Sequence, residues 1–405
     1  MSKKKKLKIL AVPANTGGCA YYRIIMPMEK LAEMFPDDIE LRMNENPLGI
    51  QKIQDEKGER LEPPPEDFDP VDLDWCDIMF TQNISNYGAP YTMNLIKSAK
   101  ERGKFVHYDT DDLLTNLYEG HRLFGVYRDQ KLSEITKWYY HNADLVTVTQ
   151  RKFAERISEY CQNTLAVVRN AVDYNLPNWN HPKVPANKKS LCRFGWVGGI
   201  HHEEDVKEFR SVALGVNSKR GHENVHWGFY GRPPIGPEDE KDWQQEVWDN
   251  YEKYMTRGVH PRHRNFDVYH ALPGDQYGVM FTHMDACIAP LQYNEFNDSK
   301  SEIKVMEAGR YGLPLIASDV GCYSDVITNG ETGYLIPRDN PRSEWVKVLT
   351  RVAKDKKHRE EMGRNLKQIT DEAYDINKII RGRLELYQEL LKLRDQVRTN
   401  ENKNT

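Results

Sequence analysis

Cysteine is scarce in this sequence and shows no pattern. The 405 residues contain six cysteines, scattered with no Cys-x-x-Cys pair and no metal-ligand spacing: Cys19, Cys76, Cys161, Cys192, Cys287 and Cys322. Scattered cysteines favour reduced, partly buried thiols. The sequence therefore predicts a cytoplasmic protein, without a disulfide framework and without a cysteine-based metal site.

Long apolar runs are also missing. The longest, such as Ala286–Leu291, fall far short of the ~20 residues that span a bilayer. The apolar stretch after Lys3–Lys6 is only as long as a strand and has no small-residue cleavage site, so it is not a signal peptide. We expect no stable membrane insertion.

A strong charge of one sign is the third feature that is lacking. The formal net charge of −4 argues against attraction of the whole molecule to nucleic acid. Acids are concentrated in Asp55–Asp77, and the remaining chain is weakly basic. The short basic cluster His260–Arg264 falls on a predicted loop, where it is either solvated or in contact with a polyanionic acceptor.

The chain does contain a regular alternation of apolar strands and amphipathic helices. Strands are predicted at 7–13, 39–43, 77–81, 104–108, 145–149, 165–169, 193–197, 225–230, 285–289 and 313–318. Helices are predicted at 21–34, 91–102, 133–142, 152–161, 204–214, 239–255 and 299–311. This alternation is typical of parallel sheets covered by helices. The predicted fold class is therefore α/β, with two Rossmann-like domains facing each other across a ligand cleft.

The domain boundaries follow from composition. We expect one Rossmann-like domain over 1–172, an Asn- and Pro-rich linker over 173–190, and a second Rossmann-like domain over 191–375. A helix over 376–397 is expected to cross back to the first domain, and 398–405 to form a tail.

The most informative segment is Asn294–Pro337. Ser299-x-x-Glu302 matches a capping box, which predicts a helix from Lys300. On such a helix Lys300, Lys304 and Glu307 share one face. The lysines at the helix start would attract an anion, and Glu307 would accept hydrogen bonds from a vicinal diol, so together they describe a nucleotide site. The alternative is an ordinary amphipathic helix with a Lys–Glu pair.

Three other places carry candidate site residues. In the loop after the first strand, Gly17 and Gly18 permit close backbone approach and positive φ, and Arg23 would reach a phosphate; the alternative is a plain strand–helix turn. No Gly-x-Gly-x-x-Gly stands here, which argues against a dinucleotide site. After the strand at 193–197, Gly198, Gly199 and His201 are candidates for contact with donor phosphate.

An acidic cluster follows the strand at 104–108. Asp109, Asp111 and Asp112 offer three carboxylates that suit a catalytic base, a metal site or a polar contact to an acceptor. Equally, Asp111 and Asp112 would cap the next helix.

The run Glu-Ala-Gly-x-x-Gly-Leu-Pro-Leu-Ile-Ala-Ser-Asp-Val-Gly from Glu307, followed by Asn-Gly-x-Thr-Gly-Tyr-Leu-Ile-Pro from Asn329, resembles the donor-binding signature of GT-B glycosyltransferases, in particular retaining family 4. The resemblance implies that Glu307 holds the nucleotide ribose and that basic side chains hold the diphosphate. Two departures stand out. Ser299 replaces the first glutamate of the usual pair, and no Arg/Lys pair follows Gly199. The sequence looks more like a phage-type subgroup with the pattern N-x-x-K-S-x-I-K-x-x-E.

The resemblance implies an enzyme that moves a hexose or pentose from a nucleotide sugar, most simply a UDP-sugar, to a hydroxyl acceptor, retaining more readily than inverting configuration. It implies an acceptor domain first and a nucleotide-sugar domain second, no required cofactor and no metal. Lys304, Glu307 and Asp111 are the expected catalytic residues. The acceptor is a glycan, a lipid-linked sugar or a hydroxymethylated pyrimidine in phage DNA, the last placing the protein in a host cytoplasm. The alternatives are a nucleotide-sugar epimerase and a non-catalytic binding protein.

Overall fold

The computed structural model describes residues 5–45, 71–83, 89–186, 191–233, 243–256 and 265–404. By their contacts they form two compact units, each assembled from separate stretches of chain. Unit 1 takes Met1–Asn116, Val126–Val172 and Ile376–Thr405, and unit 2 takes Leu117–Gly125 and Asp173–Asp375. The basic cluster His260–Arg264 and most of Asp55–Asp77 lie outside the described residues.

Unit 1 is built, in its described part, on a six-stranded parallel sheet in the order β2-β1-β3-β4-β5-β6. The strands are β1 (Leu7–Val12), β2 (Ile39–Met43), β3 (Ile78–Thr81), β4 (Phe105–Asp109), β5 (Leu145–Val148) and β6 (Thr164–Val167). The helices are α1 (Gly18–Ala20), a π-helical turn (Tyr21–Ile25), α2 (Met26–Met34), α3 (Val71–Trp75), α4 (Ala89–Glu101), α5 (Phe124–Asp129), α6 (Leu132–Asn142), α7 (Arg151–Ile157) and α15 (Ile376–Asn404). All six strands match the predicted ranges to within two residues.

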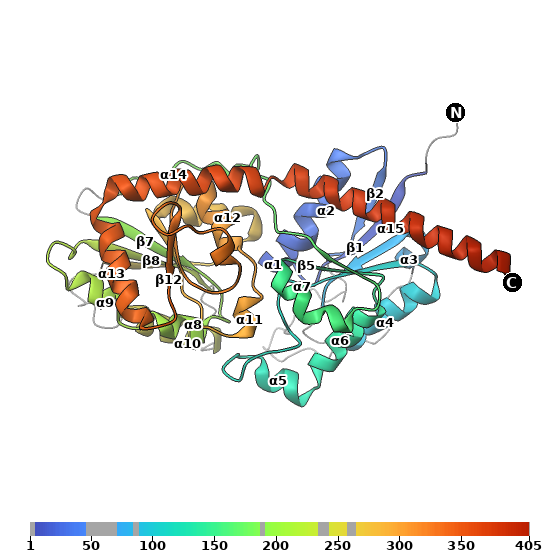
Figure 1. The fold of residues 1–405 in the computed structure, drawn as a ribbon, viewed down its shortest axis with the longest axis horizontal. Coiled ribbons are helices and arrows are strands. Elements are labelled where there is room, and N and C mark those ends of the chain that lie inside the picture. Colours follow the sequence, from blue (N-terminus) through green and yellow to red (C-terminus); the bar gives the residue numbers. More distant parts are fainter. Residues whose placement is uncertain are drawn as a thin grey trace, which may run out of the picture. The chain divides into compact units, whose positions relative to one another are not determined.

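The long helix α15 comes from the other end of the chain and packs against α2 (Figure 1). It also reaches the sheet, because Tyr387 OH lies 2.7 Å from Nδ1 of His107, a buried residue of β4. Nε2 of His107 lies 2.7 Å from Thr147 Oγ1, and Thr147 donates to Asp109 Oδ2 over 2.5 Å. α15 continues through residues that the sequence assigns to a tail.

The donors and acceptors along this buried chain of hydrogen bonds can be assigned from the protonation state of His107 and from the bond that Thr147 donates. Burial, followed by the charges of Arg383 and Arg23, holds the pKa of His107 well below its usual value, so the imidazole is neutral. The Thr147 hydroxyl donates its one hydrogen to Asp109, so in its bond with His107 it must accept from Nε2–H. Nδ1 is then the acceptor, and Tyr387 donates to it.

Unit 2 has a second six-stranded parallel sheet in its described part, in the order β12-β11-β10-β7-β8-β9. The strands are β7 (Cys192–Val197), β8 (Val225–Arg232), β9 (Phe266–His270), β10 (Ala286–Ala289), β11 (Leu315–Ser318) and β12 (Gly333–Ile336). The helices are α8 (Glu203–Glu208), α9 (Val212–Asn217), α10 (Trp243–Thr256), α11 (Glu295–Asp298), α12 (Ile303–Arg310), α13 (Pro341–Lys354) and α14 (Lys356–Ala373), with 3-10 segments at Pro177–Trp179, Gly274–His283 and Gly321–Asp325. The predicted α/β class with two Rossmann-like sheets is confirmed.

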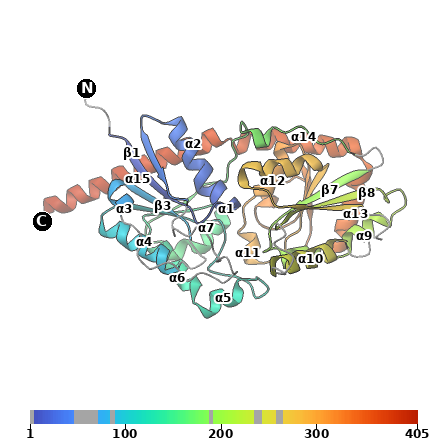
Figure 2. The same cartoon turned by 180° about the vertical axis from the view of Figure 1, so that it is seen from behind.

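Apolar side chains cover both faces of this sheet. On one face Trp227, Trp248, Trp345 and Phe209 belong to one buried cluster, which joins β8 to α8, α10 and α13. On the other side α12 lies against α14, as Figures 1 and 2 show from opposite directions. Parallel strands that are buried on both faces appear in the sequence as continuous apolar runs, which explains why most strands of this sheet could be predicted from the sequence.

Two predicted helices differ from the structure. The helix predicted at 204–214 is interrupted, because Ser211 adopts a left-handed conformation with φ of 63° between α8 and α9. The helix predicted from Lys300 begins at Ile303 instead. Glu302 occupies its N-cap position without a side-chain cap, so the capping box predicted at Ser299 and Glu302 is wrong.

Candidate functional site

The strand order of unit 2 points to one edge of its sheet. The chain adds β8 and β9 on one side of β7, then returns to add β10, β11 and β12 on the other. In open α/β sheets ligands bind at the carboxyl ends of the strands, where the order reverses. Here that point lies between β7 and β10, and it places the turn after β7 beside the segment that leads to α12.

The predicted glycines lie in the turn after β7. Gly198 is buried, and its carbonyl oxygen would stand 2.1 Å from a Cβ at Gly231, which lies near the end of β8 and has φ of +122°. Only glycine permits this approach of the two backbones. Gly199 is exposed and has open space around it.

Lys304 and Glu307 form a close pair on α12. The ammonium of Lys304 donates to Glu307 Oε2 over 2.7 Å and to Tyr277 OH over 3.1 Å. The Glu307 side chain is 1% exposed and the Lys304 side chain 16%. Burial opposes the charge on Lys304, but Glu307 and Tyr277 outweigh it and raise the lysine's pKa, so the ammonium stays charged.

Lys300 and Ser299 depart from the predicted arrangement. Lys300 precedes α12 rather than sharing its face with Lys304, and its ammonium lies 4.6 Å from the ring centroid of Phe296. Ser299, which stands where the family pattern has a glutamate, is fully buried and donates to the carbonyl oxygen of Glu295 over 2.8 Å. The structure thus brings Lys304 to Glu307, but not Lys300.

His202, which is not among the site residues predicted from the sequence, belongs to a buried polar cluster. Asp205, 1% exposed, lies with Oδ2 2.8 Å from His202 Nδ1. Its Oδ1 accepts from the backbone N–H of Gln292 over 2.8 Å and from Asn297 Nδ2 over 2.7 Å. We call these four residues the Asp205 cluster. It ties the turn after β7 to the segment after β10, across the point where the strand order reverses.

The 117–125 segment packs beside this cluster within unit 2. His121, buried, stacks on His201 with ring centroids 6.1 Å apart and lies 4.8 Å from the ring of Phe296. Tyr118 contacts the ring of Phe296 at 6.2 Å, and burial, then Asp205, raises its pKa. The predicted residue His201 is exposed and faces this segment rather than Asp205.

In unit 1 the strand order reverses between β1 and β3, and the loop after β1 opens the first helix. Gly17 and Gly18 are exposed, but neither has a positive φ, so the conformational freedom predicted for them is not used. Gly17 is the N-cap of α1 with φ of −76°, and its N–H donates to Asn15 Oδ1 over 2.7 Å. Space is open around Gly18.

Arg23 does not have the role that was predicted for it. Its guanidinium is 1% exposed and donates to both carboxylate oxygens of Asp109, over 2.8 and 2.6 Å. A third and a fourth hydrogen bond go to the carbonyl oxygen of Val168 over 2.7 Å and to Asn170 Oδ1 over 3.0 Å. These bonds commit the side chain to the interior of unit 1, so the prediction that it reaches a phosphate is wrong in this structure.

Asp111 remains a candidate at the same edge of the unit 1 sheet. It lies two residues beyond β4 and accepts a hydrogen bond from Cys19. Burial, followed by the charge of Asp112, raises the pKa of Asp111 to about 6. A carboxyl with this pKa exchanges its proton close to neutral pH.

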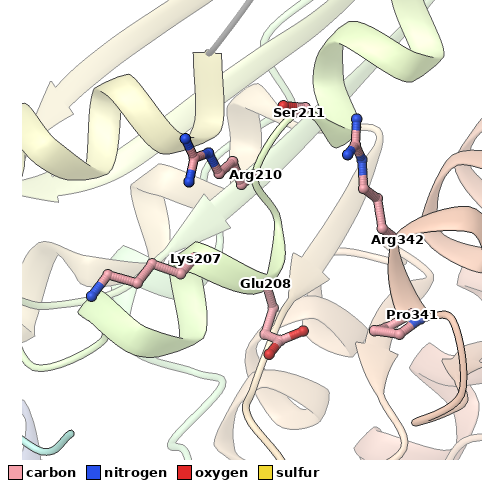
Figure 3. Close-up of a pocket in the computed structure, with 6 residues that line it drawn as sticks. All are labelled: Lys207, Glu208, Arg210, Ser211, Pro341 and Arg342. Atoms are coloured by element: carbon pink, nitrogen blue, oxygen red, sulfur yellow. The ribbon is translucent and has the colours of Figure 1, made fainter.

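A cavity of about 550 Å³ opens elsewhere in unit 2 (Figure 3). Its walls come from the α8–α9 connection and the start of α13, and the lining residues are Lys207, Glu208, Arg210, Ser211, Pro341 and Arg342. Figure 3 shows the charged ends of Lys207 and Arg342 pointing in different directions, so they do not converge on one anion. None of the site residues predicted from the sequence lines this cavity.

The described residues lack two features, a metal-ion site and a membrane-spanning helix. In that part of the chain no three His, Cys, Asp or Glu side chains are grouped to hold a metal ion. Nor is any helix there long and apolar enough to cross a membrane.

Comparison with known proteins adds a family and a fold. A model of the glycosyl transferases group 1 family matches residues 252–369, which include α12. D-inositol 3-phosphate glycosyltransferase of Paenarthrobacter aurescens is 30% identical over 111 residues, which are 25% of this chain and 27% of that protein. This chain therefore matches about a quarter of the length of that curated relative.

Two solved structures match almost the whole chain. Sucrose-phosphate synthase of Thermosynechococcus elongatus has a TM-score of 0.68 at 13% identity, covering 96% of this chain and 100% of that one. Anabaena HepE, solved with UDP and glucose, has a TM-score of 0.63 at 13% identity, covering 94% and 99%. At such low identity these matches show the fold. Together with the family match over residues 252–369, they show that the chain has the GT-B fold and that part of unit 2 is similar to the glycosyl transferases of group 1.

Proposed function

We propose that this protein transfers a sugar from a UDP-sugar to a hydroxyl acceptor with retention of configuration. The observation that carries the proposal is the position of the Lys304 ammonium on α12, beside the point where the strand order of the unit 2 sheet reverses. Glu307 of the same helix and Tyr277 of the 3-10 segment Gly274–His283 hold this ammonium in place. Anabaena HepE, which shares the fold, was also solved with UDP-glucose.

Lys304 suits a leaving diphosphate because of its hydrogen-bond geometry. An ammonium has three N–H donors, and two of them point to Glu307 and Tyr277. Among the described residues the third donor has no hydrogen-bond partner, and it would serve a phosphate oxygen. As the sugar–phosphate bond breaks, negative charge grows on the diphosphate, and an ammonium already held in place stabilises that charge without reorganising.

Glu307 has two tasks in this proposal. Its Oε2 fixes Lys304, and the carboxylate accepts hydrogen bonds from the ribose hydroxyls, as the family resemblance implies. Without a partner a carboxylate that is 1% exposed would be costly, and the ion pair with Lys304 offsets that cost.

We propose that unit 1 provides the acceptor side and that Asp111 contacts the acceptor hydroxyl. A retaining transfer needs no dedicated protein base, because the departing diphosphate can take the acceptor proton. The neighbouring carboxylates Asp111 and Asp112 repel a polyanion, which favours a neutral glycan acceptor over hydroxymethylated pyrimidine in DNA.

The test is a panel of nucleotide sugars assayed for UDP release, with glycan acceptors and with hydroxymethylcytosine DNA in separate reactions. Acceptor-dependent UDP release from one donor is the expected result. Conversion of the donor into another nucleotide sugar without an acceptor would indicate an epimerase, and an intact donor under all conditions would indicate a binding protein. Either outcome would overturn the proposal.

Two variants test the site itself. Lys304→Gln is expected to lower the turnover number by about 100- to 1000-fold, the range seen when one donor to developing charge is removed. Lys347→Gln is the matched control, because Lys347 pairs with Glu344 at 3.0 Å with the same spacing of three residues, in reverse order, on the solvent side of α13. Equal activity of the two variants would remove Lys304 from the site.

A further inference from the structure

His202 stands in the turn after β7 with one ring nitrogen committed. Asp205 is an acceptor when ionised, so His202 Nδ1, 2.8 Å away, must carry the proton of that hydrogen bond. The backbone N–H of His202 donates to Tyr251 OH over 2.9 Å, which fixes the turn from a second direction. Nε2 has no protein partner among the residues that the structure describes.

The buried carboxylate needs this histidine. Asp205 is 1% exposed, and within the described chain His202 is the group paired with it that can carry positive charge. Its other two hydrogen bonds come from neutral donors on Gln292 and Asn297. A buried carboxylate needs hydrogen-bond donors, so the bond from His202 Nδ1–H satisfies Asp205 and at the same time fixes the orientation of the imidazole ring.

Resting on the proposed function, we propose that protonated His202 is a ligand of the donor diphosphate, with Nε2–H donating to a phosphate oxygen and Asp205 as its positioning residue. This turn lacks the Arg/Lys pair that the family resemblance would place after Gly199. The imidazolium supplies a positive charge there, in a side chain that is 26% exposed. His201, the neighbouring candidate, stacks on His121 and has no such carboxylate.

This assignment makes donor affinity depend on pH. A phosphate oxygen that accepts from Nε2–H while Nδ1–H donates to Asp205 binds the doubly protonated ring, so donor binding takes up a proton and weakens as pH rises. The titratable and charged groups around His202 come from its own turn, α8, α10 and the 117–125 segment: His201, Glu203, Glu204, Asp205, Tyr251, Tyr118, His121 and Arg122.

The test measures affinity for UDP-glucose, UDP and uridine by calorimetry between pH 5.5 and 8.5, values chosen to bracket imidazole titration. UDP-glucose is the main probe, because both of its phosphates are esterified and neither is terminal. UDP has a terminal phosphate, and such a group itself titrates near about pH 6. Wild type is expected to bind UDP-glucose more weakly as pH rises. His202→Gln is expected to bind about 10- to 100-fold more weakly at the lowest pH and to lose the pH dependence. Uridine affinity should not change.

His226→Gln is the matched control. His226 Nε2 also lies 2.8 Å from a carboxylate oxygen, that of Asp267. His226 stands near the start of β8, at the end of the parallel sheet opposite to His202. It should bind UDP-glucose as wild type does. Asp205→Asn, tested for folding by circular dichroism, should weaken UDP-glucose binding and flatten its pH profile while uridine affinity stays the same.

The outcomes separate this inference from the proposed function. Wild-type affinity and pH dependence in His202→Gln would overturn the role of His202 and leave the transferase proposal standing. Equal losses of UDP-glucose and uridine affinity would show that His202 only supports the fold of the turn. Failure of the wild-type protein to bind UDP or UDP-glucose would overturn both.

Discussion

Replacing Arg23 by Met separates a structural role from a phosphate-binding role. The guanidinium is 1% exposed and its four hydrogen bonds all end inside unit 1. Methionine fills much of the same space, so the main effect is to leave the carboxylate of Asp109 buried without its cation. Breaking a buried ion pair in this way costs about 3–5 kcal/mol, and we expect the free energy of unfolding to fall by that amount.

A double variant shows whether the loss comes from the stranded charge. Arg23→Met with Asp109→Asn removes both members of the ion pair, and the amide oxygen can still accept from Thr147. We expect this variant to recover about 1–3 kcal/mol relative to Arg23→Met alone, since most of the single-variant cost is the unpaired carboxylate.

Urea denaturation followed by circular dichroism measures these changes, and calorimetry with UDP-glucose is run under conditions where each variant is folded. Arg23→Met should keep wild-type affinity for UDP-glucose. A stability loss below about 1 kcal/mol, the range of an exposed ion pair, together with a large loss of affinity would refute the reasoning and restore Arg23 as a phosphate ligand.

Three further predictions concern stability. Gly231→Ala should lower the free energy of unfolding, measured by urea denaturation, by more than about 2 kcal/mol, because φ is +122° and the new Cβ would meet the carbonyl of Gly198. Gly199→Ala, which has open space around it, should change this free energy by less than about 0.5 kcal/mol. Equal effects of the two variants would contradict the close approach of the two backbones. Asp111→Asn should stabilise the protein above pH 6 by up to about 3 kcal/mol, because the folded-state pKa is raised from 3.8 to about 6 and the ionised form is disfavoured in the fold; the gain should fade as pH drops towards 4, and a gain independent of pH would disprove this cause. Tyr387→Phe should cost about 1–3 kcal/mol, because Nδ1 of His107 loses its donor in the interior. Tyr160→Phe, at a half-buried site, serves as the control in the same thermal unfolding assay.

Local pattern was sufficient to predict most of the sheet but less of the site. β1 is a largely apolar run and β4 is buried along its whole length, so both are recognisable as strands without any partner. β12 has four residues inside a glycine-containing loop, and half-exposed β9 alternates weakly, so neither produces a clear signal. The break at Ser211 depends on a left-handed residue that no local rule favours for serine.

The site residues that were missed depend on distant partners. Arg23 meets Asp109 across 86 positions, and Asp205 meets Asn297 across 92. A single sequence contains nothing that pairs such residues. His201 and His202 are adjacent and chemically identical, and only the direction of the turn decides which one faces Asp205. In contrast, Lys304 and Glu307 are three positions apart on one helix, and their pairing could be predicted.

The route of the chain through unit 1 has a consequence for synthesis. α15 supplies Tyr387 and lays Arg383 over the ring of Phe80 at 5.3 Å, yet about 200 residues of unit 2 separate it from β6. At about 5–20 residues per second a ribosome needs roughly 10–40 s to translate them. Throughout that interval Phe80 and His107 lack the helix that shields them from water. A ribosome-bound chain that ends before Ile376 therefore carries an unfinished first unit however long it waits.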